Sequence, residues 1–121
     1  MKIAFLYAGQ GSQKVGMGKD FYENCKEYRE LIDSLEKTID VTKLMHEGPM
    51  EELTKTENTQ RCMAAFAAGV TTALAAKGIT PDVACGLSLG EYGALYAAGV
   101  FDAEEYVKLT TFRGRVMSEA A

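Results

Sequence analysis

Cysteine is scarce in this sequence, and basic residues form no cluster. The three cysteines, Cys25, Cys62 and Cys85, are odd in number and far apart, and none lies in a CxxC or Cys/His spacing. This pattern predicts neither a disulfide framework nor a zinc site, and it favours a reducing compartment. The 13 Lys and Arg residues are scattered singly and are outnumbered by 17 Asp and Glu, so the charge pattern typical of a nucleic-acid-binding protein is absent.

Long hydrophobic runs are also missing. The longest apolar stretch, Cys62 to Ala76, is interrupted by glycine and threonine and is too short to span a bilayer. The apolar start of the chain is cut by Gln10 and Gln13 before it reaches the length of a signal peptide, and no cleavage pattern follows. We therefore expect a cytoplasmic protein that binds neither membranes nor nucleic acid.

The 121 residues, 47% hydrophobic and 25% charged, suffice for about one globular domain. An apolar run from Lys2 to Tyr7 predicts a strand buried on both faces. The loop after it, AGQGSQKVGMG, is rich in glycine. It fits neither a dinucleotide fingerprint, since Lys14 stands where the third glycine belongs, nor a P-loop. A plain flexible turn stays open as an explanation.

Apolar residues then recur at helical spacing. From Asp20 onward the apolar positions predict one amphipathic helix, and the segment from Val41 to Glu57 predicts short helical turns and loop. Asn58 and Thr59 are expected to cap a second long helix that runs to about Lys77 and lies at the centre of the fold. The apolar positions of the first helix are Phe21, Cys25, Tyr28, Leu31 or Ile32, and Leu35.

The last third of the chain predicts strand, helix, helix. A short strand from Val83 to Cys85 precedes a helix that begins at or just after Ser88 and ends near Gly99. The sequence DAEE starting at Asp102 is a capping box for a final helix. The order of elements predicts an α/β domain with a parallel sheet. Only two strands are visible where such a sheet needs several, so the domain is expected to be incomplete.

The sequence GLSLG, residues 86–90, places one serine between two glycines. In a nucleophile elbow, the serine occupies a strained strand-to-helix turn, and the residues two positions to either side must be small. The helix N-terminus there favours an oxyanion. The alternative is a capping box formed by Ser88 and Glu91. The strand before the motif and the helix after it favour Ser88 as a nucleophile.

Arg113 lies on the apolar side of the last predicted helix. It is spaced by three, four or seven residues from Tyr106, Leu109, Val116 and Met117, whereas Arg115 faces the polar side. A buried guanidinium needs an anion or several acceptors. From spacing alone, three explanations remain: an internal salt bridge, a side chain that extends to water, or a clamp for a substrate carboxylate.

Several motifs together resemble the malonyl-CoA:acyl-carrier-protein transacylases and the acyltransferase domains of polyketide synthases. They occur in the family's order and spacing along the whole chain. The matching pieces are GQGSQ (Gly9–Gln13) with GMG after it, EGPMEELTKTENTQ (Glu47–Gln60), GLSLGEYGAL (Gly86–Leu95), AAGVF and RGRVM (Arg113–Met117).

The resemblance implies a role for particular residues. Ser88 would carry the malonyl group, and the backbone N–H groups of Gln10 and Leu89 would form the oxyanion hole. Arg113 would bind the free malonyl carboxylate, and Gln60 would lie beside the site. Malonyl-CoA and acyl carrier protein would be substrate and partner in fatty acid biosynthesis, and the reaction would need neither a metal nor a redox cofactor.

The resemblance also implies that a part is missing. The family's catalytic histidine, a ferredoxin-like subdomain and further strands lie downstream of Ala121. The single histidine, His46, matches no catalytic position and is expected in a loop. Two residues depart from the family: Leu87 replaces a common histidine, and Arg61 replaces a common proline at the start of its helix. We expect residues 1–121 to be the N-terminal segment of an α/β-hydrolase-like acyltransferase subdomain that needs the rest of its chain for turnover.

Two alternatives remain at this stage. A serine esterase or thioesterase of the α/β-hydrolase type would share the elbow but would have no need for an inward arginine. A non-catalytic fragment that binds CoA or the carrier protein would perform no chemistry at Ser88.

Overall fold

The computed structural model describes residues 1–121 as a two-stranded parallel sheet with seven helices. The predicted α/β class is confirmed at this level. In chain order the elements are β1 (Ala4–Tyr7), α1 (Lys19–Asn24), α2 (Lys26–Glu36), α3 (Thr42–Glu47), α4 (Met50–Thr54), α5 (Thr56–Ala76), β2 (Val83–Gly86), α6 (Leu89–Ala97) and α7 (Ala103–Ala120).

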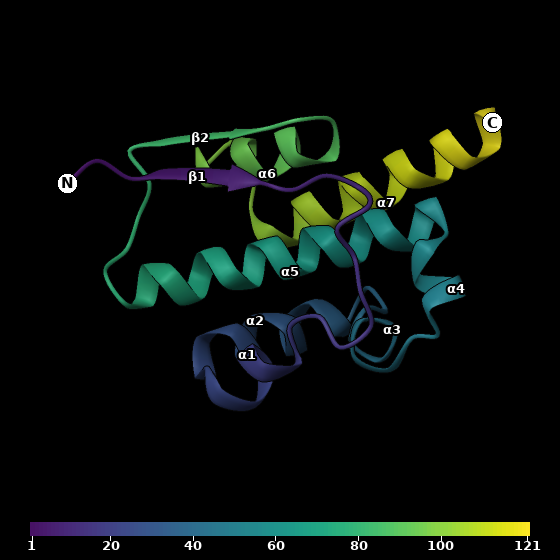
Figure 1. The fold of residues 1–121 in the computed structure, drawn as a ribbon, viewed down its shortest axis with the longest axis horizontal. Coiled ribbons are helices and arrows are strands. Elements are labelled where there is room, and N and C mark those ends of the chain that lie inside the picture. Colours follow the sequence, from purple (N-terminus) through teal and green to yellow (C-terminus); the bar gives the residue numbers. More distant parts are fainter.

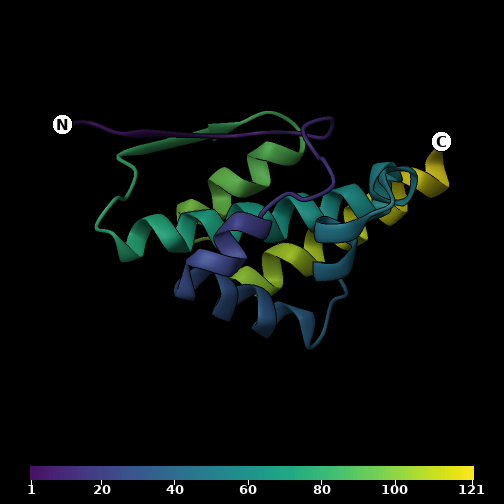
Figure 2. The same ribbon diagram turned by 60° about the horizontal axis from the view of Figure 1, so that its bottom comes forward.

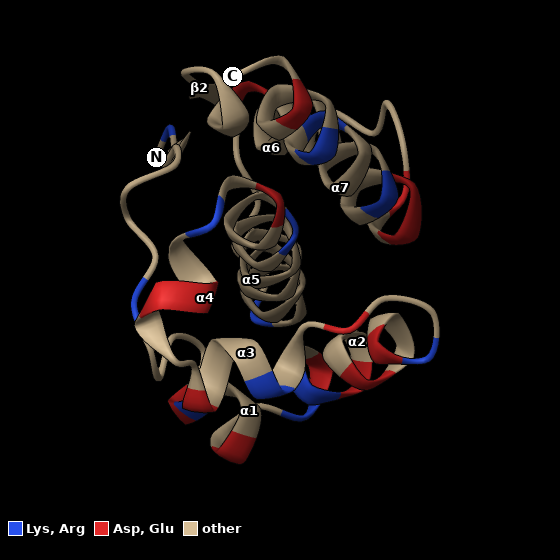
Figure 3. Ribbon diagram, turned by 90° about the vertical axis from the view of Figure 1, so that its right-hand side faces the viewer, with Lys and Arg blue, Asp and Glu red and all other residues tan.

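Helix α5 is the centre of the molecule, as predicted. The sheet lies on one side of α5, and the pair α1 and α2 lies on the other (Figures 1 and 2). A view along its axis shows the other helices around it (Figure 3). Nine of its 21 residues are buried, most of them small. Small side chains let α2, α6 and α7 pack closely against it. Acidic and basic residues lie mainly on the outer helices (Figure 3).

The predicted start of this helix is wrong. Helix α5 begins at Thr56, and Asn58 and Thr59 lie inside its first turn. Their side chains bond to the preceding helix instead: Asn58 Nδ2 donates to the Glu52 carbonyl at 2.8 Å, and Thr59 Oγ1 donates to the Leu53 carbonyl. These bonds join α4 to α5. Arg61 is therefore not at the helix start, where proline would matter.

The first amphipathic segment is two helices, not one. Cys25 has extended backbone angles, φ −124° and ψ 110°, and separates α1 from α2. On α2 the predicted core positions Tyr28, Ile32 and Leu35 are buried, whereas Phe21 and Cys25 are only partly covered. The break lets α1 fold back against α2.

The two strands pair in parallel from Ala4 with Val83 to Tyr7 with Gly86. The prediction that β1 is buried on both faces is wrong, because helices cover only one face of this sheet. Tyr7 faces α5, where its hydroxyl and that of Thr71 form a 2.7 Å hydrogen bond. Leu6 and Val83 alternate with the covered residues and are 77% and 64% exposed.

The final helix begins at the predicted capping box. Asp102 accepts a hydrogen bond from the Glu105 backbone N–H at 2.8 Å, and the Glu105 carboxylate accepts one from the Asp102 N–H at 3.0 Å. From there α7 runs along α5 to the C-terminal end (Figure 1). None of the helices combines the length and the apolar character that crossing a membrane requires.

Candidate functional site

Ser88 lies exposed at the turn between β2 and α6. Its backbone angles, φ 57° and ψ −118°, make it the only residue other than glycine with a positive φ. Such a conformation costs about 1–3 kcal/mol and is often found at functional sites. The Ser88 side chain makes no capping hydrogen bond to α6. The capping-box alternative for this serine is therefore wrong.

The two glycines of GLSLG are required by close backbone packing. A Cβ on Gly86 would lie 2.2 Å from the Gly90 backbone, and a Cβ on Gly90 would lie 2.2 Å from the Tyr7 carbonyl oxygen. Both distances are far below any van der Waals contact. Only glycine at these positions allows β2, α6 and β1 to meet at the Ser88 turn.

Arg113 reaches this turn from α7. Its Nη2 donates to Ser88 Oγ at 3.1 Å, and its Nη1 donates to Gln60 Oε1 at 2.9 Å. The guanidinium also lies over the ring of Tyr92, with 5.3 Å from Cζ to the ring centroid. The four ion pairs of the structure involve other residues. The internal salt bridge considered for Arg113 is therefore not formed, and its positive charge has no carboxylate partner among residues 1–121.

The apolar stripe predicted around Arg113 is only partly correct. Tyr106 is buried, but Leu109, Val116 and Met117 are exposed. Gly114, one of the buried residues of α7, lies against the first turn of α5, where an added Cβ would lie 2.9 Å from Glu57 Cα. Arg113 is half-buried beside this contact, while Arg115 is exposed, as expected.

Gln60 and Gln10 extend the contacts of the arginine. Gln60 is 1% exposed. Its Nε2 donates to Gln10 Oε1 at 3.1 Å and lies 3.9 Å from Met117 Sδ. Gln10 Nε2 in turn donates to Thr56 Oγ1 at 3.1 Å. The structure thus joins the side chains of four of the five predicted site residues, Gln10, Gln60, Ser88 and Arg113, in one hydrogen-bonded group.

The fifth residue, Leu89, enters the site through its backbone. It is the first residue of α6, and the first N–H groups of a helix have no partner within the helix. The loop that carries Gln10 runs against the same turn, since a Cβ on Gly9 would lie 3.2 Å from the Leu87 carbonyl oxygen. The oxyanion roles of Leu89 and Gln10 stay predictions.

Three residues near the centre were missed from the sequence: Thr56, Tyr92 and Gly114. Tyr92 follows Ser88 by four residues, one helical turn, which is a signal that could have been used. Thr56 likewise precedes Gln60 by four residues on α5. Gly114 adjoins Arg113, but its contact with α5 depends on how the two helices cross, which spacing does not reveal.

His46 is not part of this centre. It lies within α3, although a loop was expected. Its ring and that of Tyr22 meet edge-on, with 5.2 Å between the ring centroids. Its Nε2 is buried and has no hydrogen-bond partner. Burial and the nearby positive charge of Lys19 lower the pKa of His46. No hydrogen bond connects this imidazole to Ser88.

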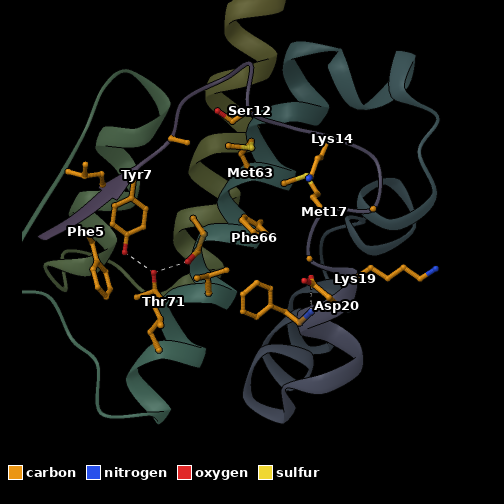
Figure 4. Close-up of a pocket in the computed structure, with 18 of the residues that line it drawn as sticks. Phe5, Tyr7, Ser12, Lys14, Met17, Lys19, Asp20, Met63, Phe66 and Thr71 are labelled. Carbon is orange, nitrogen blue, oxygen red and sulfur yellow. Dashed lines mark hydrogen bonds between the residues drawn. The ribbon is translucent and has the colours of Figure 1, made fainter. Parts of the chain in front are cut away.

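A pocket lies elsewhere, between β1, the glycine-rich loop, α1 and α5 (Figure 4). It has a volume of about 930 Å³, and most of its lining is apolar, including Phe5, Met63 and Phe66. Neither Ser88 nor Arg113 lines it. The serine–arginine centre is therefore a separate surface site.

A family model for the acyl transferase domain matches residues 4–121. Because the match takes in nearly the whole chain, the protein belongs to the acyl transferase domain family. The resemblance to malonyl-CoA:acyl-carrier-protein transacylases is confirmed by its relatives. The malonyl CoA-acyl carrier protein transacylase of Bacillus subtilis is 43% identical over an alignment of 121 positions, which covers 98% of this chain and 38% of that protein.

Solved structures agree with this assignment. The malonyl CoA-acyl carrier protein transacylase of Clostridium perfringens superposes with a TM-score of 0.93 at 41% identity, covering 100% of this chain and 39% of that one. A malonyl-transacylase in complex with a type II PKS acyl-carrier protein gives a TM-score of 0.92 at 34% identity, with 100% and 40% covered. The chain thus spans about two fifths of the length of these relatives.

Proposed function

We propose that the chain carries the acyl-serine centre of a transacylase that moves a malonyl group from malonyl-CoA to the phosphopantetheine thiol of acyl carrier protein. In this proposal the turn at Ser88 is the nucleophile elbow of an α/β-hydrolase-like sheet, and residues 1–121 are its N-terminal segment. The observation that carries the proposal is the Arg113 guanidinium, which has no carboxylate partner and lies 3.1 Å from Ser88 Oγ.

The position of the guanidinium suits a short acyl group that ends in a carboxylate. In a malonyl thioester, two C–C bonds of about 1.5 Å each separate the reacting carbonyl carbon from the carboxylate carbon. When that carbonyl carbon approaches Ser88 Oγ, the carboxylate is within reach of Arg113. A guanidinium binds a carboxylate through two parallel hydrogen bonds, which fix the orientation of the carboxylate while the positive charge balances its negative charge.

The reaction has two balanced steps. The Ser88 oxygen attacks the thioester carbonyl, the C–S bond breaks, and CoA leaves as a thiol after receiving the serine proton. The carrier-protein thiol then attacks the malonyl-serine ester, and the serine oxygen regains a proton. In both steps the negative charge on the carbonyl oxygen would be stabilised by the N–H groups of Leu89 and Gln10. No electrons are exchanged, and the chemistry calls for no redox cofactor or metal.

The serine needs a base, and the described contacts of Ser88 do not supply one. Arg113 only donates hydrogen bonds, so it cannot accept the hydroxyl proton. His46, on α3, contacts the ring of Tyr22 on α1 and makes no hydrogen bond to Ser88. We propose that the base is not among residues 1–121. These residues alone should then transfer malonyl groups much more slowly than the Bacillus subtilis relative under the same conditions, and similar rates would contradict this part of the proposal.

Mass spectrometry of the acylated protein tests the central claim. After incubation of the native-length protein with malonyl-CoA, we expect a malonyl adduct on the peptide that contains Ser88. Ser88→Ala should abolish the adduct, and Ser118→Ala, a change at an exposed serine on α7, should leave it unchanged. Absence of the adduct in the wild-type protein would support a fragment that only binds CoA or the carrier protein.

A further inference from the structure

Thr56 ends a series of side-chain hydrogen bonds that starts at the substrate-binding arginine of the proposed function. The series runs from Arg113 Nη1 to Gln60 Oε1 at 2.9 Å, from Gln60 Nε2 to Gln10 Oε1 at 3.1 Å, and from Gln10 Nε2 to Thr56 Oγ1 at 3.1 Å. It connects α7 and the glycine-rich loop to the first residue of α5. The Thr56 side chain itself makes no hydrogen bond to Arg113 or Ser88.

The direction of every bond in this series follows from the arginine. A guanidinium has five N–H donors and no acceptor, so the Gln60 oxygen must face it. The Gln60 NH₂ group then points to Gln10 and requires its oxygen, which leaves the Gln10 NH₂ group at the far end. That group lies at the exposed end of the series and donates to Thr56 Oγ1, the last acceptor of the series.

Reversal of either amide would disturb the arginine. If Gln10 turned, its NH₂ group would face the NH₂ group of Gln60, and Gln60 could restore that bond only by presenting its own NH₂ group to the guanidinium. Gln60 is 1% exposed, so water has little access to relieve the mismatch of donors. The Thr56 hydroxyl, as the last acceptor, favours the one arrangement in which Arg113 is correctly bonded.

We propose that Thr56 is a positioning residue for the carboxylate clamp. Acting through Gln10 and Gln60, its hydroxyl holds the Arg113 guanidinium in the orientation that receives the free carboxylate of the acyl group. This inference rests on the proposed function and concerns how acyl groups with and without a carboxylate are distinguished.

The test compares Thr56→Val with Thr56→Ser in the native-length protein. Valine keeps the shape of threonine and removes the acceptor, whereas serine keeps the hydroxyl. We expect Thr56→Val to lower kcat/KM for malonyl-CoA by roughly three- to tenfold, the size of one hydrogen bond. Acetyl-CoA, which has no carboxylate, should be used as before, and Thr56→Ser should stay within about twofold of wild type. A structural defect would instead lower kcat/KM for both substrates together.

A second variant makes the test independent of the stability of Thr56→Val. Gln10→Met removes the side-chain amide but retains the backbone N–H group, and it lies in an exposed loop. If Thr56 acts through Gln10, adding Thr56→Val to Gln10→Met should have no further effect on malonyl selectivity. Additive losses, or a malonyl-to-acetyl ratio that is unchanged in Thr56→Val, would overturn the proposal.

A spectroscopic measurement separates this inference from the proposed function. In ¹H–¹⁵N spectra, the Gln60 side-chain NH₂ and Arg113 guanidinium signals should shift or broaden in Thr56→Val and stay in place in Thr56→Ser. This readout needs no turnover. Failure of Ser88 to become acylated would overturn the proposed function alone, whereas unchanged Gln60 and Arg113 signals would overturn the positioning role alone.

Discussion

The Arg113 guanidinium stacks over Tyr92, with Cζ 5.3 Å from the ring centroid. The two residues come from α7 and α6, and the aromatic face holds the cation next to Ser88 without neutralising it. A cation–π contact of this kind contributes about 0.5–2 kcal/mol and uses none of the five N–H groups, so those that are not bonded to Gln60 and Ser88 can still bind an anion. The positive charge is thus fixed in place and has no carboxylate partner among residues 1–121.

Replacement of Arg113 by alanine should therefore change substrate choice more than overall activity. We expect Arg113→Ala to lower kcat/KM for malonyl-CoA by roughly 10- to 100-fold, the range for hydrogen bonds to a charged group. Transfer of uncharged acyl groups should persist or rise. Steady-state kinetics with malonyl-CoA and acetyl-CoA measure both effects.

Arg115→Ala is the matched control, because Arg115 is exposed on the same helix, over the Phe112 ring. It should leave the malonyl-to-acetyl ratio unchanged. Equal losses for the two substrates in Arg113→Ala would favour an esterase in which the arginine has only a structural role.

Gly90→Ala should destabilise the fold at the Ser88 turn. The new methyl group would lie 2.2 Å from the Tyr7 carbonyl oxygen, so β1 and α6 would have to separate. Overpacking of this kind costs about 1–3 kcal/mol or more, which exceeds the gain of about 1 kcal/mol from replacing a helical glycine. Chemical denaturation should show the loss. Glu91→Ala, the exposed neighbour, should change stability by no more than about 0.5 kcal/mol, and an equal value for Gly90→Ala would contradict the packing argument.

Local signals in the sequence predicted many of the elements. The capping box at Asp102 fixes the start of α7, and the glycines around Ser88 mark the turn from strand to helix, because both depend on residues next to each other in the chain. The break at Cys25 could not be predicted in this way. The helical spacing of the apolar residues continues through Cys25, and only the packing of α1 back on α2 separates the two helices.

Tertiary contacts explain the other differences. The apolar residues of β1 predicted burial on both faces, but burial depends on which elements cover a sheet, and Leu6 remains exposed. On α7 the contact with α5 includes Gly114, which has no side chain and so contributes nothing to an apolar pattern. Arg113 was predicted to face inward, but its partner Gln60 was placed near it only by resemblance to the family.

Tyr28→Phe should leave the protein as stable as before or more stable. Tyr28 is fully buried, packed against Gly69 and Phe21, and its hydroxyl has no hydrogen-bond partner. Burial raises the pKa of this phenol. An unsatisfied buried hydroxyl costs about 1–3 kcal/mol, so its removal should not be harmful. Thermal or urea unfolding measures the change.

Tyr22→Phe provides the comparison for Tyr28. The Tyr22 hydroxyl donates to Asp33 at 2.5 Å, so its removal should cost up to about 1 kcal/mol. A loss of more than about 1 kcal/mol in Tyr28→Phe would mean that the buried hydroxyl has a partner, such as a bound water.

His46 should make stability depend on pH below neutrality. Burial and the positive charge of Lys19 lower its pKa from the ordinary 6.5, against the opposing charges of Glu23 and Glu47. Between the native pKa and 6.5 the unfolded chain binds more protons than the native protein at this residue. Lowering the pH through that window therefore favours unfolding, and the stability contributed by the neutral imidazole is present in full only above it.

Urea unfolding between about pH 8 and pH 5 checks this, with wild type compared with His46→Gln, which stays neutral throughout. The variant should lose less stability than wild type as the pH falls, because the carboxylates titrate alike in both proteins and cancel in the difference. A wild-type protein that gained stability relative to His46→Gln on acidification would mean that Glu23 and Glu47 outweigh burial and Lys19, and that the pKa of His46 is raised. The difference curve therefore reports which of these two influences dominates at the buried face of α3.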